Sequence, residues 1–246
     1  LPNSSSARLN NYPILGSQAR DAKEKMVYFG PWETYFLVAE ALERQWVTPG
    51  EVGGLTAENA YNKAVKLSFI HFGVSQYYDD YISSREYNRV GTSVAYNHTD
   101  PASSVTMKYV DGYTDQEGTV QYQYPDGTRT LYGNQLNDHL SKIFTQKYIA
   151  QLPYLVQECW SDYRRVGLPF FDIIANEKMM TGTDMTEWDP ESWKSGQKWQ
   201  YYPQRMRYPT TLDNANPTEY KHALELLGGA NTTMVPLWWS LAYSQK

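Results

Sequence analysis

The stretch "QKYIAQLPYLVQECWSDYRRVGLP", residues 146–169, contains the pattern that decides the fold. Two short helical patterns flank Pro153, and proline ends or kinks an α-helix. The second pattern places apolar residues three and four positions apart, which predicts one buried helical face made of Val156, Cys159, Trp160 and Tyr163. The spacing therefore predicts two packed helices joined at the proline.

The second helical pattern ends in an arginine pair, Arg164 and Arg165. Cations near a helix C-terminus interact favourably with the helix dipole, and guanidinium groups do not act as bases at ordinary pH. Asp162 and Glu158 precede Arg165 by one and two turns, so we expect an ion-paired helix end. Cys159 lies in the apolar stripe and is interpreted as a small buried hydrophobe rather than a nucleophile. The stretch is thus predicted to be a packing joint rather than a catalytic cluster.

Outward from this joint, residues 31–73 are predicted to form an antiparallel helical hairpin. Pro31 suits a first helical turn, and one stripe is predicted to hold Trp32, Tyr35, Ala39, Leu42 and Trp46. Thr56 is the expected N-cap of the second helix and Gly73 its end. The predicted face of that helix holds Ala57, Ala60, Tyr61, Ala64, Leu67, Ser68 and His71. Small residues on this face would let the two helix axes come close. The segment "SQYYDDYIS", residues 75–83, is expected to extend the packing.

An insertion with a β-hairpin is predicted over residues 84–137. Residues 100–118 show turn chemistry, while residues 119–133 alternate around Pro-Asp-Gly, which predicts a hairpin there. Helices 138–167 then follow, with Asp138 as the expected cap and an apolar face of Leu140, Ile143, Phe144, Tyr148 and Ile149. Residues 168–246 are predicted to be loop-rich, with residues 176–215 as loops and a final helix from Pro217 to Gly228. The predicted fold is mainly α, with long loops and one inserted β-hairpin.

Composition excludes several classes of function. The chain has 246 residues, a formal charge of −5 and a pI of about 5.4, so no positive field favours nucleic acid or an anionic membrane. One cysteine excludes an internal disulfide framework and a cysteine zinc cluster. The first residues lack the pattern of a signal peptide.

No motif in the sequence predicts a catalytic centre, a metal site or a cofactor site. The four histidines lie far apart without a metal-ligand spacing: His71, His98, His139 and His222. Carboxylate groups are candidates for glycoside hydrolysis, but we interpret them as solvated: Asp79 with Asp80, and Asp184 with Glu187, Asp189 and Glu191. Asp111, Asp115 and Glu117 match a calcium loop only in part.

Aromatic residues are unusually abundant, at 15% of the chain, with 22 Tyr and 8 Trp. Their rings combine an apolar face with a polar edge, which suits the apolar face and hydroxyl rim of a sugar. The predicted ligand-binding residues are the aromatics outside the helical stripes, namely Tyr78, Tyr113, Trp188 and Trp193. Packing remains the alternative for each of them.

Three ordered blocks resemble the SusD/RagB-like outer-membrane lipoproteins, in particular the SusD-like nutrient-binding branch. The first block, in the opening stretch, matches through Gln146, Lys147, Glu158, Trp160, Arg164, Arg165, Gly167 and Pro169. The second, in the predicted hairpin, matches through Glu33, Ala39, Glu40 and Ala41. The third matches through Pro203, Arg205, Tyr208, Pro209, Asn216, Tyr220, Gly228, Gly229, Trp238 and Trp239.

The resemblance implies a TPR-like helical scaffold on a SusC-like TonB-dependent transporter at the extracellular face of the outer membrane. Residues 1–246 would be the C-terminal portion of a single SusD-like domain about twice as long, attached to the membrane only through a lipid anchor missing from this chain. Such proteins bind nutrients, most often oligosaccharides and also peptides, without cleaving them, as in Bacteroidetes-type polysaccharide utilisation. Two alternatives are a structural module that docks the transporter through residues 100–134, and a helical glycoside hydrolase that uses Asp189 or Glu191.

Overall fold

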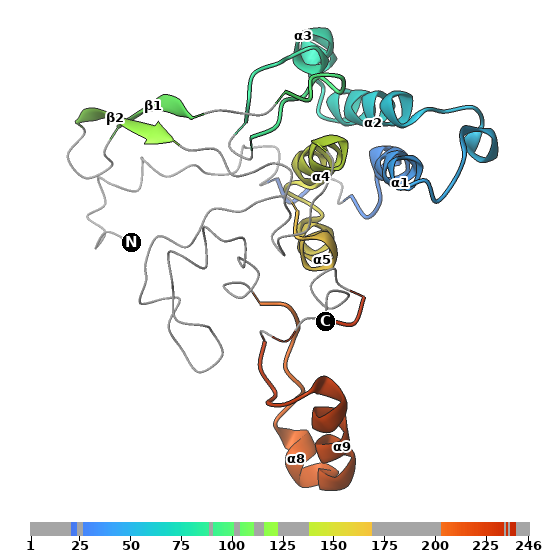
Figure 1. The fold of residues 1–246 in the computed structure, drawn as a ribbon, viewed down its shortest axis with the longest axis vertical. Coiled ribbons are helices and arrows are strands. Elements are labelled where there is room, and N and C mark those ends of the chain that lie inside the picture. Colours follow the sequence, from blue (N-terminus) through green and yellow to red (C-terminus); the bar gives the residue numbers. More distant parts are fainter. Residues whose placement is uncertain are drawn as a thin grey trace. The chain divides into compact units, whose positions relative to one another are not determined.

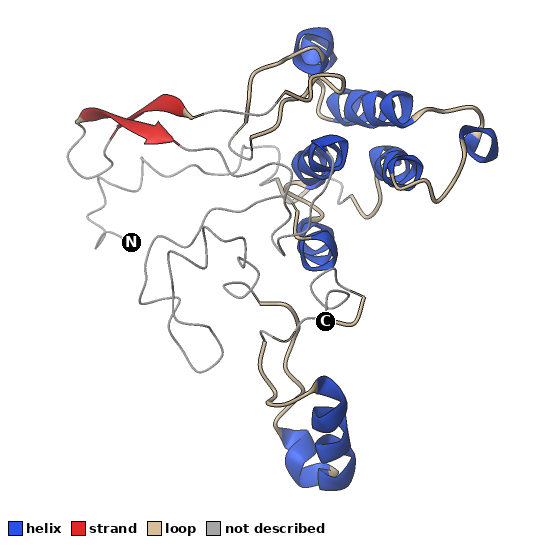
Figure 2. Ribbon diagram, viewed as in Figure 1, coloured by secondary structure: helices blue, strands red, loops and turns tan. Residues whose placement is uncertain are grey.

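The computed structural model describes residues 21–23, 27–88, 91–100, 104–110, 116–122, 138–168, 203–233, 235 and 237–239. The chain forms two compact units. Unit 1 comprises Leu1–Gly127 and Gln146–Val156, and unit 2 comprises Thr128–Thr145 and Gln157–Lys246. In the described residues helices predominate and one two-stranded sheet is present (Figure 2), so the fold is mainly α, as predicted. None of the described helices has the length and apolar character needed to cross a membrane.

Helices α1 (Pro31–Glu43) and α2 (Ala57–His71) pack side by side in unit 1 (Figure 1). The start of α1 meets the end of α2, where the rings of Trp32 and His71 lie 4.8 Å apart, so the helices are antiparallel. Ala60 and Ala64 are fully buried, which permits the predicted close approach of the two helices. Thr56 caps α2 as expected, because its hydroxyl accepts a hydrogen bond from the Asn59 amide at 3.1 Å.

The predicted stripe of α1 is partly wrong. The buried residues of α1 are Trp32, Glu33, Phe36, Ala39 and Glu40. Trp46 is instead 65% exposed, because α1 ends at Glu43 and Gln45 takes a left-handed conformation with φ 57°. The helix therefore ends before the last residue of the predicted apolar stripe. A short 3-10 helix, η3 (Pro49–Val52), lies in the connection to α2.

Two short helices extend the packing after α2, as predicted: η4 (Ser75–Tyr77) and α3 (Tyr78–Ile82). The rings of Tyr78 and Tyr81 lie 5.9 and 5.0 Å from the ring of Phe69 on α2. Aromatic contacts of this kind favour tilted and edge-on arrangements. They attach α3 to the C-terminal half of α2.

The hairpin lies within the predicted insertion but has a different first strand. Strand β1 (Val105–Val110) pairs antiparallel with β2 (Glu117–Tyr122), with Val105 opposite Tyr122 and Val110 opposite Glu117. The turn interpretation of residues 100–118 is therefore wrong at β1, whose V-T-M-K-Y alternation is itself a strand pattern. The Pro-Asp-Gly turn lies outside the described residues.

Helix α4 (Asp138–Gln151) is buried on every side along residues 140–147. Its polar residues are therefore paired within the protein. The ammonium of Lys142 lies 3.1 Å from the carboxylate of Asp138, and the hydroxyl of Thr145 donates to the carbonyl of Ser141 at 2.7 Å. Asp138 is the first helical residue, one position inside the predicted cap. Burial of unpaired polar groups costs free energy, so these pairs allow a polar helix to lie in a core.

Helix α5 (Val156–Val166) follows the turn at Pro153, as the opening stretch predicts. Cys159, Tyr163 and Val166 are buried. Val156 is 54% exposed, contrary to the prediction, because the packed surface does not reach the first turn of the helix. Arg165 pairs with Asp162 at 3.0 Å, and the guanidinium of Arg164 lies 3.8 Å from the Trp160 ring centroid. The contact with Asp162 is the ion pair expected at the end of α5.

Two further helices lie in unit 2: α8 (Thr211–Ala215) and α9 (Pro217–Leu227). The bounds of α9 agree with the predicted final helix, and Gly228 follows it with φ 84°, a conformation that favours glycine. The prediction of loops over residues 176–215 is wrong at Thr211–Ala215, and residues 176–202 lie outside the described residues.

Candidate ligand-binding surface

Tyr78, a predicted ligand-binding residue, is the first residue of α3. Its ring packs edge-on against Phe69, and the ammonium of Lys66 lies 5.4 Å from its centroid. Its hydroxyl donates to the carbonyl of Asn62 at 3.0 Å. Burial, followed by the negative charge of Asp79, raises the pKa of the Tyr78 hydroxyl. These contacts fix the ring and leave it half-buried.

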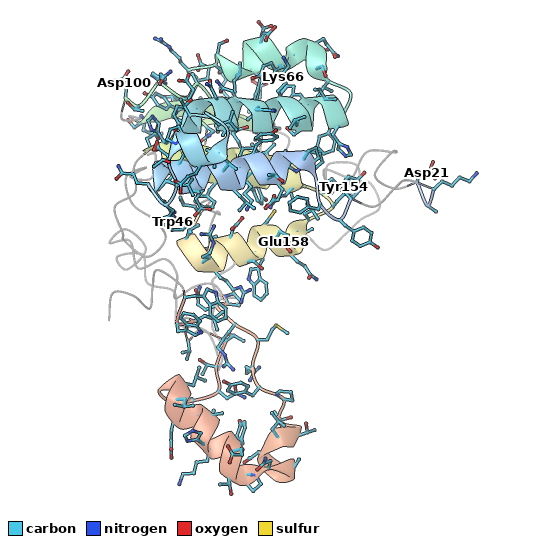
Figure 3. All side chains as sticks on the ribbon, turned by 90° about the vertical axis from the view of Figure 1, so that its right-hand side faces the viewer. Asp21, Trp46, Lys66, Asp100, Tyr154 and Glu158 are labelled. Carbon is cyan, nitrogen blue, oxygen red and sulfur yellow. The ribbon has the colours of Figure 1, made fainter. Side chains whose placement is uncertain are left out.

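Tyr77, which the sequence did not single out, is 61% exposed beside Tyr78. The next two residues, Asp79 and Asp80, have exposed side chains in the first turn of α3. An open phenol ring and two carboxylates therefore lie next to Tyr78 in the sequence, and Tyr78 is the residue whose ring Lys66 (labelled in Figure 3) contacts. We call Lys66, Tyr77, Tyr78, Asp79 and Asp80 the α3 surface. The tyrosine pair was the available signal, but only the structure distinguishes the open ring from the packed one.

The other three predicted ligand-binding residues, Tyr113, Trp188 and Trp193, lie outside the described residues. The same holds for the carboxylates Asp184, Glu187, Asp189 and Glu191, and for Asp111 and Asp115 of the partial calcium pattern. Their roles stay predictions.

A Ser-His-Asp set that the sequence analysis did not find lies in the loop after α3. The hydroxyl of Ser93 is 2.8 Å from Nδ1 of His98, and Nε2 of His98 is 3.4 Å from the carboxylate of Asp100. In a hydrolase the serine faces the substrate and the aspartate is buried. Here Ser93 is 1% exposed and the Asp100 side chain is 82% exposed, which is the reverse. The set therefore holds the loop together.

Residues of the first two sequence blocks meet in a buried polar network of unit 1. The ammonium of Lys147 lies 2.7 Å from Glu33, and the amide of Gln151 donates to the same carboxylate at 2.9 Å. The hydroxyl of Tyr81 donates to the amide oxygen of Gln146 at 2.8 Å. These motif residues hold α1 and α3 to the C-terminal part of α4. They specify the fold rather than the ligand.

Residues of the third block form a polar clamp in unit 2, which we define as Arg205, Tyr208, Asn231 and Thr232. The guanidinium of Arg205 donates to the side-chain oxygen of Asn231 at 3.1 Å and to the carbonyl of Thr232 at 2.8 Å. The side-chain amide of Asn231 makes two hydrogen bonds with the backbone of Tyr208: it donates to the carbonyl and accepts from the N–H, each at 2.9 Å.

Among the described residues, no group of three His, Cys, Asp or Glu side chains is placed to hold a metal ion.

Solved structures of SusD homologues are similar to this chain. One from Parabacteroides distasonis is 30% identical with a TM-score of 0.61, over 88% of this chain and 33% of that one. A chitin-binding homologue from Flavobacterium johnsoniae is 25% identical with a TM-score of 0.51, over 85% and 35%. One from Bacteroides ovatus, 23% identical with a TM-score of 0.55 over 87% and 37%, shares the fold.

This chain spans about a third of the length of these relatives, less than the half expected from the resemblance. No curated protein matches the sequence. The sequence model of one family, described as "Susd and RagB outer membrane lipoprotein", matches residues 3–240. That match covers nearly the whole chain and includes all three blocks, so the chain belongs to the SusD-like family.

Proposed function

We propose that this protein binds an oligosaccharide at the outer face of the bacterial outer membrane and passes it, uncleaved, to a SusC-like TonB-dependent transporter. The observation that carries the proposal is the SusD-like match over residues 3–240. The chitin-binding homologue supports the ligand class, because that relative binds a glycan.

The α3 surface has the chemistry that sugar binding needs. The exposed ring of Tyr77 can cover the apolar face of a sugar, while Asp79 and Asp80 can accept hydrogen bonds from its hydroxyls. The contacts of Tyr78 with Phe69 and Asn62 hold the neighbouring ring in place before ligand arrives. Preorganised groups lose less entropy on binding, which favours this surface as a ligand contact.

Affinity electrophoresis through gels that contain a soluble polysaccharide tests the proposal. A panel of glycol chitin, xyloglucan, β-glucan and starch samples several sugar linkages. We expect one of them to retard the wild-type protein and Tyr77→Ala to reduce the retardation.

Tyr28→Ala is the matched control, because Tyr28 is 83% exposed and lies outside the α3 surface. The double variant Trp188→Ala, Trp193→Ala tests the predicted residues outside the described part. If no glycan retarded the protein and the protein bound members of a peptide library, the ligand would be a peptide and not an oligosaccharide.

The second candidate function is docking of the transporter through the β1–β2 hairpin. One face of the hairpin exposes Thr106, Lys108, Val110, Glu117, Thr119 and Gln121. This row is mostly polar, as expected for a solvated or transiently contacted surface. Deletion of residues 104–122 should abolish co-purification with the transporter and leave glycan retardation unchanged. Co-purification of the deletion variant would exclude this role.

A further inference from the structure

Another exposed aromatic residue, Trp46, lies at the other end of the α1–α2 hairpin. The α3 surface is attached near Phe69, toward the end of α2, whereas Trp46 follows α1 and precedes the start of α2. Helix α2 has 15 residues, so the two surfaces are on the order of 20 Å apart at 1.5 Å per residue. In Figure 3, Trp46 lies beyond one end of α1, and Tyr154 lies toward the opposite end. The indole is therefore separate from the α3 surface.

A strained turn presents this indole. Gln45 has φ 57°, in the left-handed region where a helix normally ends on glycine. Two backbone hydrogen bonds hold the turn: Gln45 N–H donates to the carbonyl of Leu42 at 3.0 Å, and Trp46 N–H to that of Ala41 at 2.9 Å. Strain of this kind persists where the surrounding structure enforces it, and it occurs often at ligand contacts.

Ordered groups precede and follow Trp46 in the sequence. The guanidinium of Arg44 lies 5.2 Å from the Trp46 ring centroid and is held by Glu40 at 2.9 Å, which is cation–π geometry. Two residues after Trp46 in the sequence, Thr48 donates to Glu51 through its amide and its hydroxyl, each at 2.8 Å. These hydrogen bonds, the backbone one first, lower the pKa of Glu51. The indole of Trp46 thus contacts Arg44 and is still 65% exposed.

The same end of the hairpin carries carboxylates and an amide. The hydroxyl of Tyr96 donates to Glu43 at 2.9 Å, and the amide of Asn97 donates to Glu58 at 2.7 Å. Burial first, and then the hydrogen bond to Glu43 and the charges of Glu43 and Glu58, raises the pKa of the Tyr96 hydroxyl. Both carboxylates are therefore close to Tyr96. Glu43 ends α1 and Glu58 is in the first turn of α2, so both belong to the helix ends that the segment containing Trp46 connects. Carboxylates and amides are the groups that orient sugar hydroxyls.

We propose that Trp46, with the exposed amide of Gln45, is a second carbohydrate contact that stacks the apolar face of one sugar ring on its exposed indole. The proposal rests on the proposed function, because it assigns a further surface to the same class of ligand. A stable protein interface buries roughly 800 Å² on each partner and is centred on several large residues. One indole bordered by charged groups is too small for that, and its size matches a single sugar ring.

The test uses the full chain and calorimetric titration with chitohexaose, cellohexaose, maltohexaose and xylohexaose. Trp46→Ala should leave the thermal midpoint unchanged, because the side chain is mostly exposed, and should weaken binding of the hexasaccharide that wild type binds by about tenfold. Trp46→Tyr should retain most of the affinity, since it keeps a ring. In a Tyr77→Ala background, Trp46→Ala should weaken binding further, because the two surfaces are separate.

Unchanged affinity in both Trp46→Ala and the double variant, with Tyr77→Ala weakened, would overturn this inference and leave the proposed function intact. If wild type bound none of the four hexasaccharides and none of the gel polysaccharides, the proposed function and this inference would both be overturned. If Trp46→Ala lowered the thermal midpoint, the comparison of Trp46→Tyr with Trp46→Gln would decide, and equal affinities would reject the stacking role.

Discussion

Among the residues that the structure describes, two helix pairs, α1–α2 in unit 1 and α8–α9 in unit 2, start from similar local signals and are stabilised differently. Each has a proline in the first turn of one helix, Pro31 or Pro217, and a side-chain cap on one helix, Thr56 or Asn216. In α1–α2 several packed residues are at most 1% exposed, namely Phe36, Ala39, Ala60, Tyr61 and Ala64. In α8–α9 no residue is buried.

The difference shows that caps determine where a helix begins, whereas burial determines how much free energy its packing contributes. Burial of a large apolar side chain contributes about 1.5–3 kcal/mol to the free energy of unfolding. In α1–α2 several buried side chains contribute to it. Leu226 of α9 is 76% exposed and gains little of it. The polar clamp around Asn231 holds the segments that flank α8–α9. One hairpin has an apolar core, and the other depends on side-chain hydrogen bonds.

The largest expected effect separates the two hairpins directly. Tyr61→Ala should lower the free energy of unfolding by about 3–5 kcal/mol, because it removes a fully buried ring. Leu226→Ala, its matched exposed counterpart, should change it by less than about 0.5 kcal/mol. Denaturant titrations followed by circular dichroism measure both. Similar losses in the two variants would contradict the comparison.

Lys147→Ala should lower the free energy of unfolding by roughly 3 kcal/mol. It leaves the buried carboxylate of Glu33 without its ion-pair partner at 2.7 Å. Lys147→Met paired with Glu33→Gln should restore part of the loss, since neither residue then carries a charge. If the single and double variants are equally unstable, the charge pairing is not the source of the stability.

Asn231→Ala should lower the free energy of unfolding by about 1–2 kcal/mol, because the backbone N–H and carbonyl of Tyr208 and the guanidinium of Arg205 each lose a partner. The loss should appear as faster amide hydrogen exchange at residues 203–233, with the amides of α1 and α2 unaffected. Asn216→Ala is the control, since it removes one N-cap hydrogen bond of α9 and leaves the clamp intact. Equal exchange of residues 203–209 in the two variants would show that the clamp has no special role.

The smallest expected effect concerns Tyr96 and appears only at alkaline pH. The folded state raises the pKa of the Tyr96 hydroxyl above its usual 10.0. It therefore holds this proton more tightly than the unfolded chain. The associated stability is complete below about pH 10 and is lost as the pH rises above it. Tyr96→Phe should flatten the pH dependence of the thermal midpoint above pH 10. Identical midpoint profiles for the variant and wild type would exclude Tyr96 as the group responsible.

Local patterns in the sequence predicted the ends of α2 and α9 well. Thr56, Pro217 and Gly228 act within one helical turn, and their effect does not depend on distant segments. The end of α1 was missed because Gln45 takes a conformation that the sequence would signal only with glycine. For the same reason Trp46 was placed on a packed stripe rather than on the surface. Of the α3 surface, the sequence identified Tyr78 but not Tyr77, because adjacent tyrosines cannot be distinguished without knowing which one faces Phe69.

By itself the sequence determined the helical fold class, the interruption of the helix at Pro153 and the family, because periodicity, caps and motif order are properties of neighbouring residues. Tertiary structure alone decided which polar side chains are buried and which aromatic rings are open. The side chain of Gln151 donates to Glu33, which is 118 positions away in the sequence, so local spacing does not specify this partner. Burial depends on what the rest of the chain places over a residue, so the exposed rings of Tyr77 and Trp46 become visible only when the helices are packed.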